Sequence, residues 1–127
     1  MIRKSFKAGE DLKPYRFATL SADGEAVKAT EETTGILIVT GELEALKDEV
    51  IDAYILGLSE IEVGGAIPAG AEISVDAEGR AVKAEGGRVA GYLLDAAATA
   101  AGQVVNFVFM PDYAVKTVST EDAQLSE

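Results

Sequence analysis

An internal repeat is the feature that most constrains how this chain can fold. Residues 22–29 read ADGEAVKA, and residues 77–84 read AEGRAVKA. Two copies of one unit, each too small to bury an apolar face alone, are expected to share one core. The sequence therefore predicts a single β domain over residues 9–111, built from two related halves at about 9–63 and 64–111. The match extends on both sides of the motif to the pairs 35–37 with 91–93 and 50–52 with 104–106.

The fold class follows from short apolar segments that alternate with polar residues and are separated by glycine turns. In residues 72–76 the period is two, which points Ile73 and Val75 to a core and the acids to water. Asp23-Gly24 and Glu78-Gly79 are typical of tight hairpins, because glycine supplies the positive φ that such turns need. We expect an all-β fold, a small barrel or sandwich. The strands are predicted at residues 16–20, 26–29, 35–40, 50–56, 58–63, 71–76, 81–84, 88–94 and 104–110.

One segment departs from the strand pattern. Residues 42–49 are strong helix formers, and Leu43, Leu46 and Val50 lie at helical spacing. We therefore predict one short helix over residues 42–47, followed by a strand. The matching connection in the second half, residues 95–102, is rich in alanine and is compatible with either a helical turn or a loop.

Composition removes most catalytic chemistry. The chain has no cysteine, histidine or tryptophan. Disulfides, thiolate or histidine metal sites and the common nucleophile arrangements are therefore impossible. The acidic residues Glu42, Glu44, Asp48, Glu49 and Asp52 lack the spacing and glycine of a calcium loop, and we interpret them as a solvated face. We expect no enzyme activity, no catalytic residue, no metal site and no cofactor.

Charge is unevenly distributed along the chain. The net charge of −11 disfavours nucleic acid and anionic membrane partners, and no apolar stretch is long enough for a transmembrane helix. Residues 1–8 nevertheless carry three basic residues and no acid, which makes them a basic N-terminal arm suited to an acidic surface or a frayed end. Residues 112–127 are mostly polar or acidic, and we expect an acidic, mobile C-terminal tail.

With the repeat in view, the chain resembles the head decoration, or capsid cement, proteins of tailed bacteriophages over about residues 7–111. Members of that family carry the same pattern of turn residues twice, and the pattern ends in a hydrophobic strand and a proline. The residues that carry the resemblance are 8–12 (AGEDL), 22–29, 35–37 (GIL), 66–70 (AIPAG), 77–84 and 91–93 (GYL).

The resemblance implies a β-tulip-like barrel or sandwich and a virion protein made in the host cytoplasm. Such a protein binds the outer surface of the mature head, bridges major capsid subunits and stabilises the shell. It implies a homo-oligomer, with a trimer favoured over a dimer. For capsid contact we single out Ile2, Arg3, Lys4, Phe6 and Lys7. For subunit contact we single out Pro111, Tyr113 and Val115.

Two other functions stay open. A free-standing β-barrel module that binds a carbohydrate or another small ligand needs a concave pocket with converging polar groups. An accessory domain of an enzyme needs a catalytic partner. Nothing in the sequence marks either of them.

Overall fold

A computed structural model describes residues 2–86 and 88–111, and all regular secondary structure within them is β-strand. Among these residues no helix could cross a membrane. The all-β prediction is confirmed. The strands are β1 (Ile2–Lys7), β2 (Phe17–Leu20), β3 (Ala26–Lys28), β4 (Ile38–Thr40), β5 (Val50–Glu62), β6 (Glu72–Val75), β7 (Ala81–Lys83), β8 (Gly91–Leu93) and β9 (Val104–Phe109).

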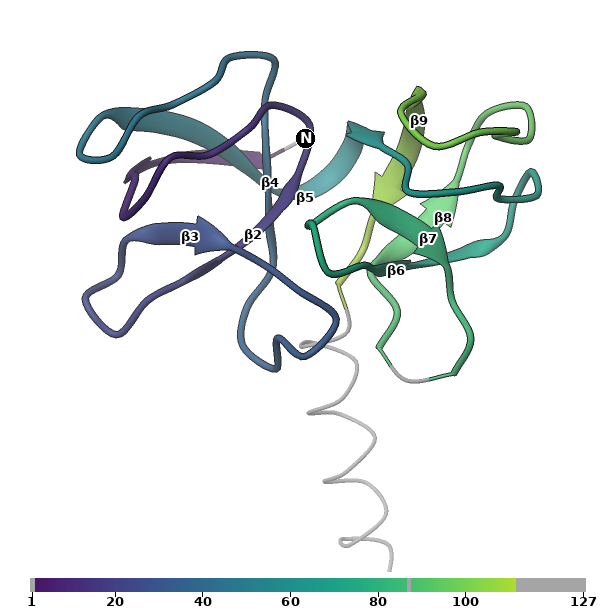
Figure 1. Cartoon of the computed structure of the whole chain (residues 1–127), viewed down its shortest axis with the longest axis horizontal. Coiled ribbons are helices and arrows are strands. Elements are labelled where there is room, and N and C mark those ends of the chain that lie inside the picture. The colour runs from purple at the N-terminus through teal and green to yellow at the C-terminus, as the bar shows by residue number, and fades with distance from the viewer. Residues whose placement is uncertain (1, 87, 112–127) are drawn as a thin grey trace, which may run out of the picture.

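The nine described strands form one curled antiparallel sheet in the order β3-β2-β4-β5-β9-β8-β6-β7, with β1 also paired to β5. The long strand β5 belongs to two lobes. Up to Leu56 it pairs with β1 and β4, and from Gly57 onward it pairs with β9. We call residues 2–56 the first lobe and residues 58–111 the second lobe. Figure 1 shows the lobes side by side, with β5 running from one into the other.

The two lobes repeat the same connections, as the sequence predicts. The β2-β3 hairpin of the first lobe corresponds to the β6-β7 hairpin of the second, and β4 corresponds to β8. The predicted match of residues 35–37 with 91–93 is wrong by three positions, because Val39 occupies in the first lobe the place that Tyr92 occupies in the second. Even the isolated bridges are repeated: the parallel pair Ala8 and Ala26 returns as Val63 and Ala81. By the same correspondence, β1 of the first lobe is equivalent to residues 57–62 of β5 in the second lobe.

Alternation of apolar and polar residues explains why the segments form strands. In β9, Val105, Phe107 and Phe109 are buried, whereas Val104 and Asn106 are exposed. The structure joins the two strands predicted at residues 50–56 and 58–63 into one continuous β5. It also adds β1, which the sequence analysis treated as a terminal arm.

The predicted helix at residues 42–47 is wrong. Ala45 instead exchanges two backbone hydrogen bonds with Leu12, at 2.8 and 3.0 Å, so its amide and carbonyl are not available to a helix. Leu43 and Leu46 are exposed and form no apolar helix face. Ile67 and Ala98 make the same bridge in the second lobe, so residues 95–102 are also a loop. The pairing required by the repeat overrides the local helix propensity.

The core is divided unequally between the lobes. The larger cluster fills the second lobe and also takes in Phe17, Leu37 and Val39 from the first. The smaller cluster lies within the first lobe and is rich in alanine, including Ala18, Ala45 and Ala53. The first lobe therefore depends on the second for the burial of its largest side chains.

Phe17 is the central contact between the lobes. Its ring centroid lies 5.7 Å from that of Phe107 in an edge-to-face arrangement and 6.1 Å from that of Phe109. Its backbone amide donates a 2.7 Å hydrogen bond to the carbonyl of Gly79 in the β6-β7 turn. Burying a phenylalanine contributes about 1.5–3 kcal/mol, and each favourable ring pair adds about 0.5–1.5 kcal/mol.

Arg16 of the first lobe makes the polar contacts at the edge of the same interface. The Arg16 guanidinium donates to Glu62 at 3.2 Å and to the carbonyl oxygen of Glu78 at 3.0 Å. Arg80 lies 3.9 Å from the same Glu62 carboxylate and 3.2 Å from Asp76. These groups are mostly buried, so removing one would leave charged partners without compensation.

The repeat supplies a matched pair of glycines that tests the lobe interface. Gly24 and Gly79 occupy equivalent turns with φ of 80° and 78°. A Cβ at Gly24 would meet open space, whereas a Cβ at Gly79 would lie 2.9 Å from the carbonyl oxygen of Phe17. We expect Gly24→Ala to lower the free energy of unfolding by about 1–2 kcal/mol through backbone strain alone. Gly79→Ala should cost about 1–3 kcal/mol more, because the lobes must shift apart.

Urea denaturation of both variants measures this difference. Equal losses for Gly24→Ala and Gly79→Ala would contradict the close approach of Phe17 to the β6-β7 turn.

Candidate interaction surface

Strand β1 contains all five residues that the sequence analysis singled out for capsid contact. It pairs antiparallel with β5 from Ile2 opposite Leu56 to Lys7 opposite Val50, with an irregularity between Ile2 and Arg3. Its other edge carries no partner strand among the described residues. An unpaired edge offers main-chain donors and acceptors to an added strand.

The side chains of β1 are divided between two faces. Arg3, Ser5 and Lys7 alternate with Lys4 and Phe6 along the strand. Phe6 is half-buried and packs against the apolar cluster of the first lobe. The structure therefore brings the five residues onto one strand, but it does not gather them into a single patch.

The three cations of β1 differ in how far the chain itself neutralises them. The Lys7 ammonium lies 3.8 Å from Glu25 and 3.7 Å from Asp48. The Lys4 ammonium lies 4.9 Å above the centre of the Phe6 ring and 3.3 Å from the carbonyl oxygen of Ser5, and neither group carries a charge. Lys4 is thus better placed than Lys7 to meet an acidic partner.

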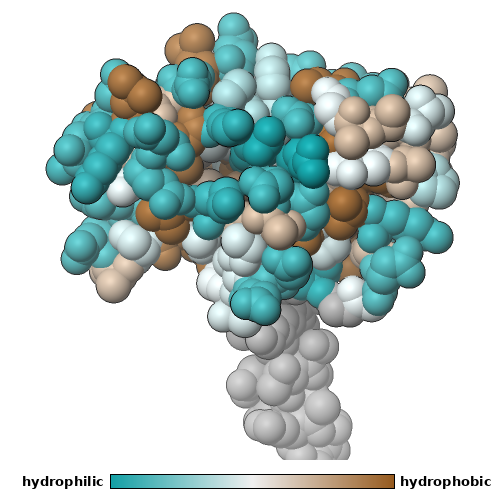
Figure 2. Space-filling view, in the orientation of Figure 1, coloured by the Kyte–Doolittle hydropathy of each residue, from teal (hydrophilic) through white to brown (hydrophobic). Residues whose placement is uncertain are grey.

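Arg3 borders an open groove of about 730 Å³ on the first lobe. Acidic side chains line much of it, together with Leu43, Val50 and Tyr54. The four acids of the predicted solvated face that line the groove are Glu42, Glu44, Glu49 and Asp52. Within residues 2–86 and 88–111, no three acidic side chains are close enough together to hold a metal ion. On the face shown in Figure 2, hydrophilic residues predominate and apolar residues lie in small patches.

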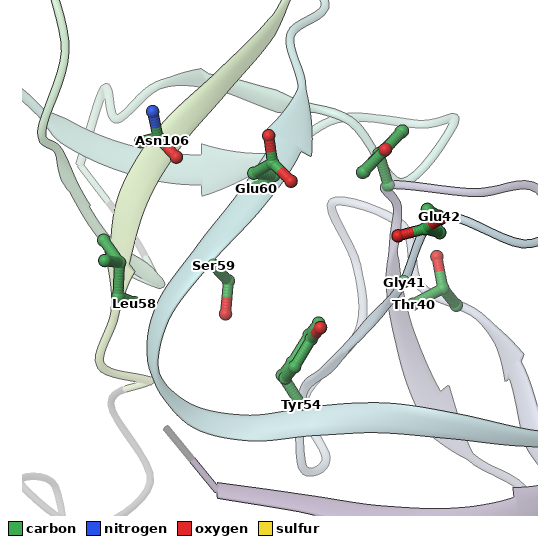
Figure 3. A pocket seen from close by; sticks show the side chains of 9 residues that line it. Thr40, Gly41, Glu42, Tyr54, Leu58, Ser59, Glu60 and Asn106 are labelled. Carbon is green, nitrogen blue, oxygen red and sulfur yellow. The ribbon is translucent and has the colours of Figure 1, made fainter.

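A second, smaller cavity of about 170 Å³ lies where the two lobes meet (Figure 3). Tyr15 and Tyr54 line it with Glu42, Glu60 and Asn106. Figure 3 shows β5 curving around it between Tyr54 and Ser59. Partial burial raises the pKa of Tyr15 above its ordinary value, and the negative charges of Glu60 and Glu42 raise it further. A tyrosine hydroxyl is protonated at neutral pH even without this shift, so Tyr15 can donate a hydrogen bond into the cavity.

The residues singled out for subunit contact are only partly described. Pro111 is buried at the end of the described chain. Tyr113 and Val115 lie outside the described residues, as does the acidic tail.

Comparison with known proteins finds similarity among solved structures. No protein-family model and no curated protein matches the sequence. Among solved structures, the chain is similar to the N base of the head fiber protein gp8.5 of bacteriophage phi29. The TM-score is 0.69 and the sequence identity is 23%, and the match covers 86% of this chain and 93% of that one. At this identity the likeness establishes a shared fold.

The contacts of β1 predict that packing and backbone pairing, rather than charge, hold the strand in place. Lys7→Ala should lower the free energy of unfolding by less than about 1 kcal/mol, because both of its ion pairs are exposed. Phe6→Ala should cost about 2 kcal/mol, since it removes a half-buried ring from the first-lobe cluster. Chemical denaturation of the two variants measures both values. A larger loss for Lys7→Ala than for Phe6→Ala would show that charge anchors the strand.

Proposed function

We propose that this protein is a phage head protein that binds the outer surface of the mature capsid as a decoration, or cement, protein. The observation that carries the proposal is the shared fold with the phi29 head fiber N base over most of both chains. The repeated pattern of turn residues, which resembles that of capsid decoration proteins, supports the same assignment independently of the fold.

Stabilisation of the shell follows from the selectivity of binding. A protein that binds the expanded shell and not the precursor or the free subunit stabilises the expanded shell by mass action. An oligomer that bridges neighbouring major capsid subunits increases this effect through effective concentration. We expect a homo-oligomer, with a trimer favoured over a dimer.

Strand β1 is the proposed capsid-facing element. Its open edge can extend a sheet across a capsid seam, and its exposed Arg3 and Lys4 can meet acidic capsid groups. Ile2 is also exposed and supplies apolar area beside these charges.

Cosedimentation with undecorated, expanded heads of the phage that encodes the protein tests this function. We expect saturable binding and an increase in the temperature at which the heads open. Absence of binding to these heads would overturn the proposal.

Charge reversal within β1 tests the capsid-facing element. Lys4→Glu should weaken head binding about tenfold and reduce its salt dependence, because an attractive contact becomes repulsive. Lys13→Glu is the matched control, since Lys13 is exposed and lies outside β1. It should change the affinity by less than about twofold. If the triple reversal of Arg3, Lys4 and Lys7 left affinity and salt dependence unchanged, β1 would not face the capsid.

The cavity between the lobes supports a second candidate, a module that binds a small carbohydrate. Tyrosine rings with neighbouring carboxylate and amide groups are suited to stacking on and hydrogen bonding to a sugar. Titration with maltotriose and chitotriose, followed by NMR, separates the two functions. Saturable shifts that disappear in Tyr54→Ala would favour the carbohydrate module. Unchanged spectra leave the decoration protein as the better assignment.

A further inference from the structure

The interface inside the chain uses a defined row of side chains from the first lobe. Phe17, Val39 and Tyr54 lie directly opposite one another on β2, β4 and β5, so they share one face of the sheet. Phe17 and Val39 are fully buried in the large core cluster, and Tyr54 packs against it. This face of the first lobe therefore covers the core of the second lobe. We call it the donor face.

The second lobe has the same face with nothing packed on it among the described residues. The equivalent row is Glu72, Tyr92 and Val108, on β6, β8 and β9, and Leu58 of β5 continues it. Tyr92 is 40% exposed and Leu58 is 51% exposed. Glu72 at one end of the row accepts a 3.5 Å hydrogen bond from the Tyr92 hydroxyl, and the other three residues expose apolar or aromatic surface. A mostly apolar row across a sheet is unusual as a solvent-facing surface. The second lobe thus presents a donor face that the fold does not use.

The first lobe has the complementary surface. In the second lobe, Ile61, Val75 and Phe109 belong to the core that the first lobe covers, and they are nearly or fully buried. Their equivalents in the first lobe are Phe6, Leu20 and Ile55, which are only partly buried. We call the surface around these three residues of the first lobe the acceptor side. Its side chains are less buried than their equivalents in the second lobe.

Charges repeat across the same pair of surfaces. Across the internal interface, Lys28 of the first lobe lies 3.7 Å from Glu78 of the second. The repeat places Lys83 and Asp23 at the equivalent positions, 55 residues after and before, and both are exposed. In the equivalent pair the cation, Lys83, is in the second lobe and the anion, Asp23, is in the first lobe. The two positions therefore still carry opposite charges.

We propose that a second copy of this chain occupies the free donor face, so that the second lobe of one copy packs against the first lobe of the next. This contact between two copies has the same arrangement as the interface between the two lobes of one chain. It brings Lys83 of one copy to Asp23 of its neighbour. It uses two different surfaces, so its repetition gives a closed ring or an open filament. We expect the ring to close as the trimer included in the proposed function, whose subunit contact this inference supplies.

The contact between copies is weaker than the internal one. Glu72 stands where Phe17 stands in the first lobe, and Ala71 stands where Arg16 stands. The between-copy interface therefore lacks the central ring and the buried guanidinium. We expect an oligomer that dissociates on dilution without unfolding of the lobes.

Cysteine cross-linking tests the arrangement on the full chain and without capsids, so its result is independent of the proposed function. The chain has no cysteine of its own. A mixture of Asp23→Cys and Lys83→Cys proteins should be linked by a short bis-maleimide at least tenfold more than either protein alone, because this reagent spans the length of the ion pair that the two cysteines replace. The double variant Lys28→Cys and Glu78→Cys is the positive control and should close within one chain.

Sedimentation of substituted full chains provides a second test. The unsubstituted protein should sediment as a multiple of its 13.2 kDa monomer. Tyr92→Glu should sediment as a folded monomer, because it places a charge in the middle of the donor face. Leu43→Glu, which changes an apolar side chain 75% exposed outside that face, should keep the oligomer. A monomeric unsubstituted protein at millimolar concentration, an oligomeric Tyr92→Glu, or equal cross-linking by Asp23→Cys alone would overturn the inference.

Discussion

The packing of Phe17 between Phe107 and Phe109 is the contact on which the rest of the structure depends. Neither lobe encloses enough apolar volume alone: the first has an alanine-rich interior, and the second is covered by side chains from the first. The ring cluster joins the two halves within the larger core cluster, and the ion pair of Arg16 with Glu62 lies at the polar edge of this contact. The shared strand β5 also links the two halves, because it pairs with β1 and β4 in the first lobe and with β9 in the second.

Divergence between the two halves explains why a duplicated unit gives an asymmetric molecule. Positions 53 and 55 of the first lobe are alanine and isoleucine, whereas the equivalent positions 107 and 109 are phenylalanine. The second lobe is therefore built to receive an aromatic side chain, and the first is not. Conversely, Glu72 stands where Phe17 stands in the first lobe, and Glu72 is exposed whereas Phe17 is buried. Within the chain, the first lobe is therefore the donor and the second lobe the acceptor of the interface between the lobes.

Much of this fold could be predicted from sequence, because the repeat and the alternation of residues are strong local signals. The sequence located eight of the nine described strands, although it divided β5 into two. The helix at residues 42–47 failed because propensity ignores the bridge between Leu12 and Ala45. Strand β1 was missed because its charges suggested a free arm. The repeat held the missing signal, since residues 3–8 precede the predicted strand at 58–63 by 55 positions. The ion pairs of Lys7 with Glu25 and Asp48 could not be predicted from sequence, because they join residues that only the tertiary structure brings together.

We propose that this acidic, two-lobed protein lies on the outside of a phage head, with the edge strand β1 toward the shell. Electron cryomicroscopy of expanded heads saturated with the protein tests this claim most directly. We expect two-lobed density on the outer surface at the junctions between major capsid subunits, with β1 nearest the shell. Density confined to the interior of the head, or none above that of undecorated heads, would contradict it.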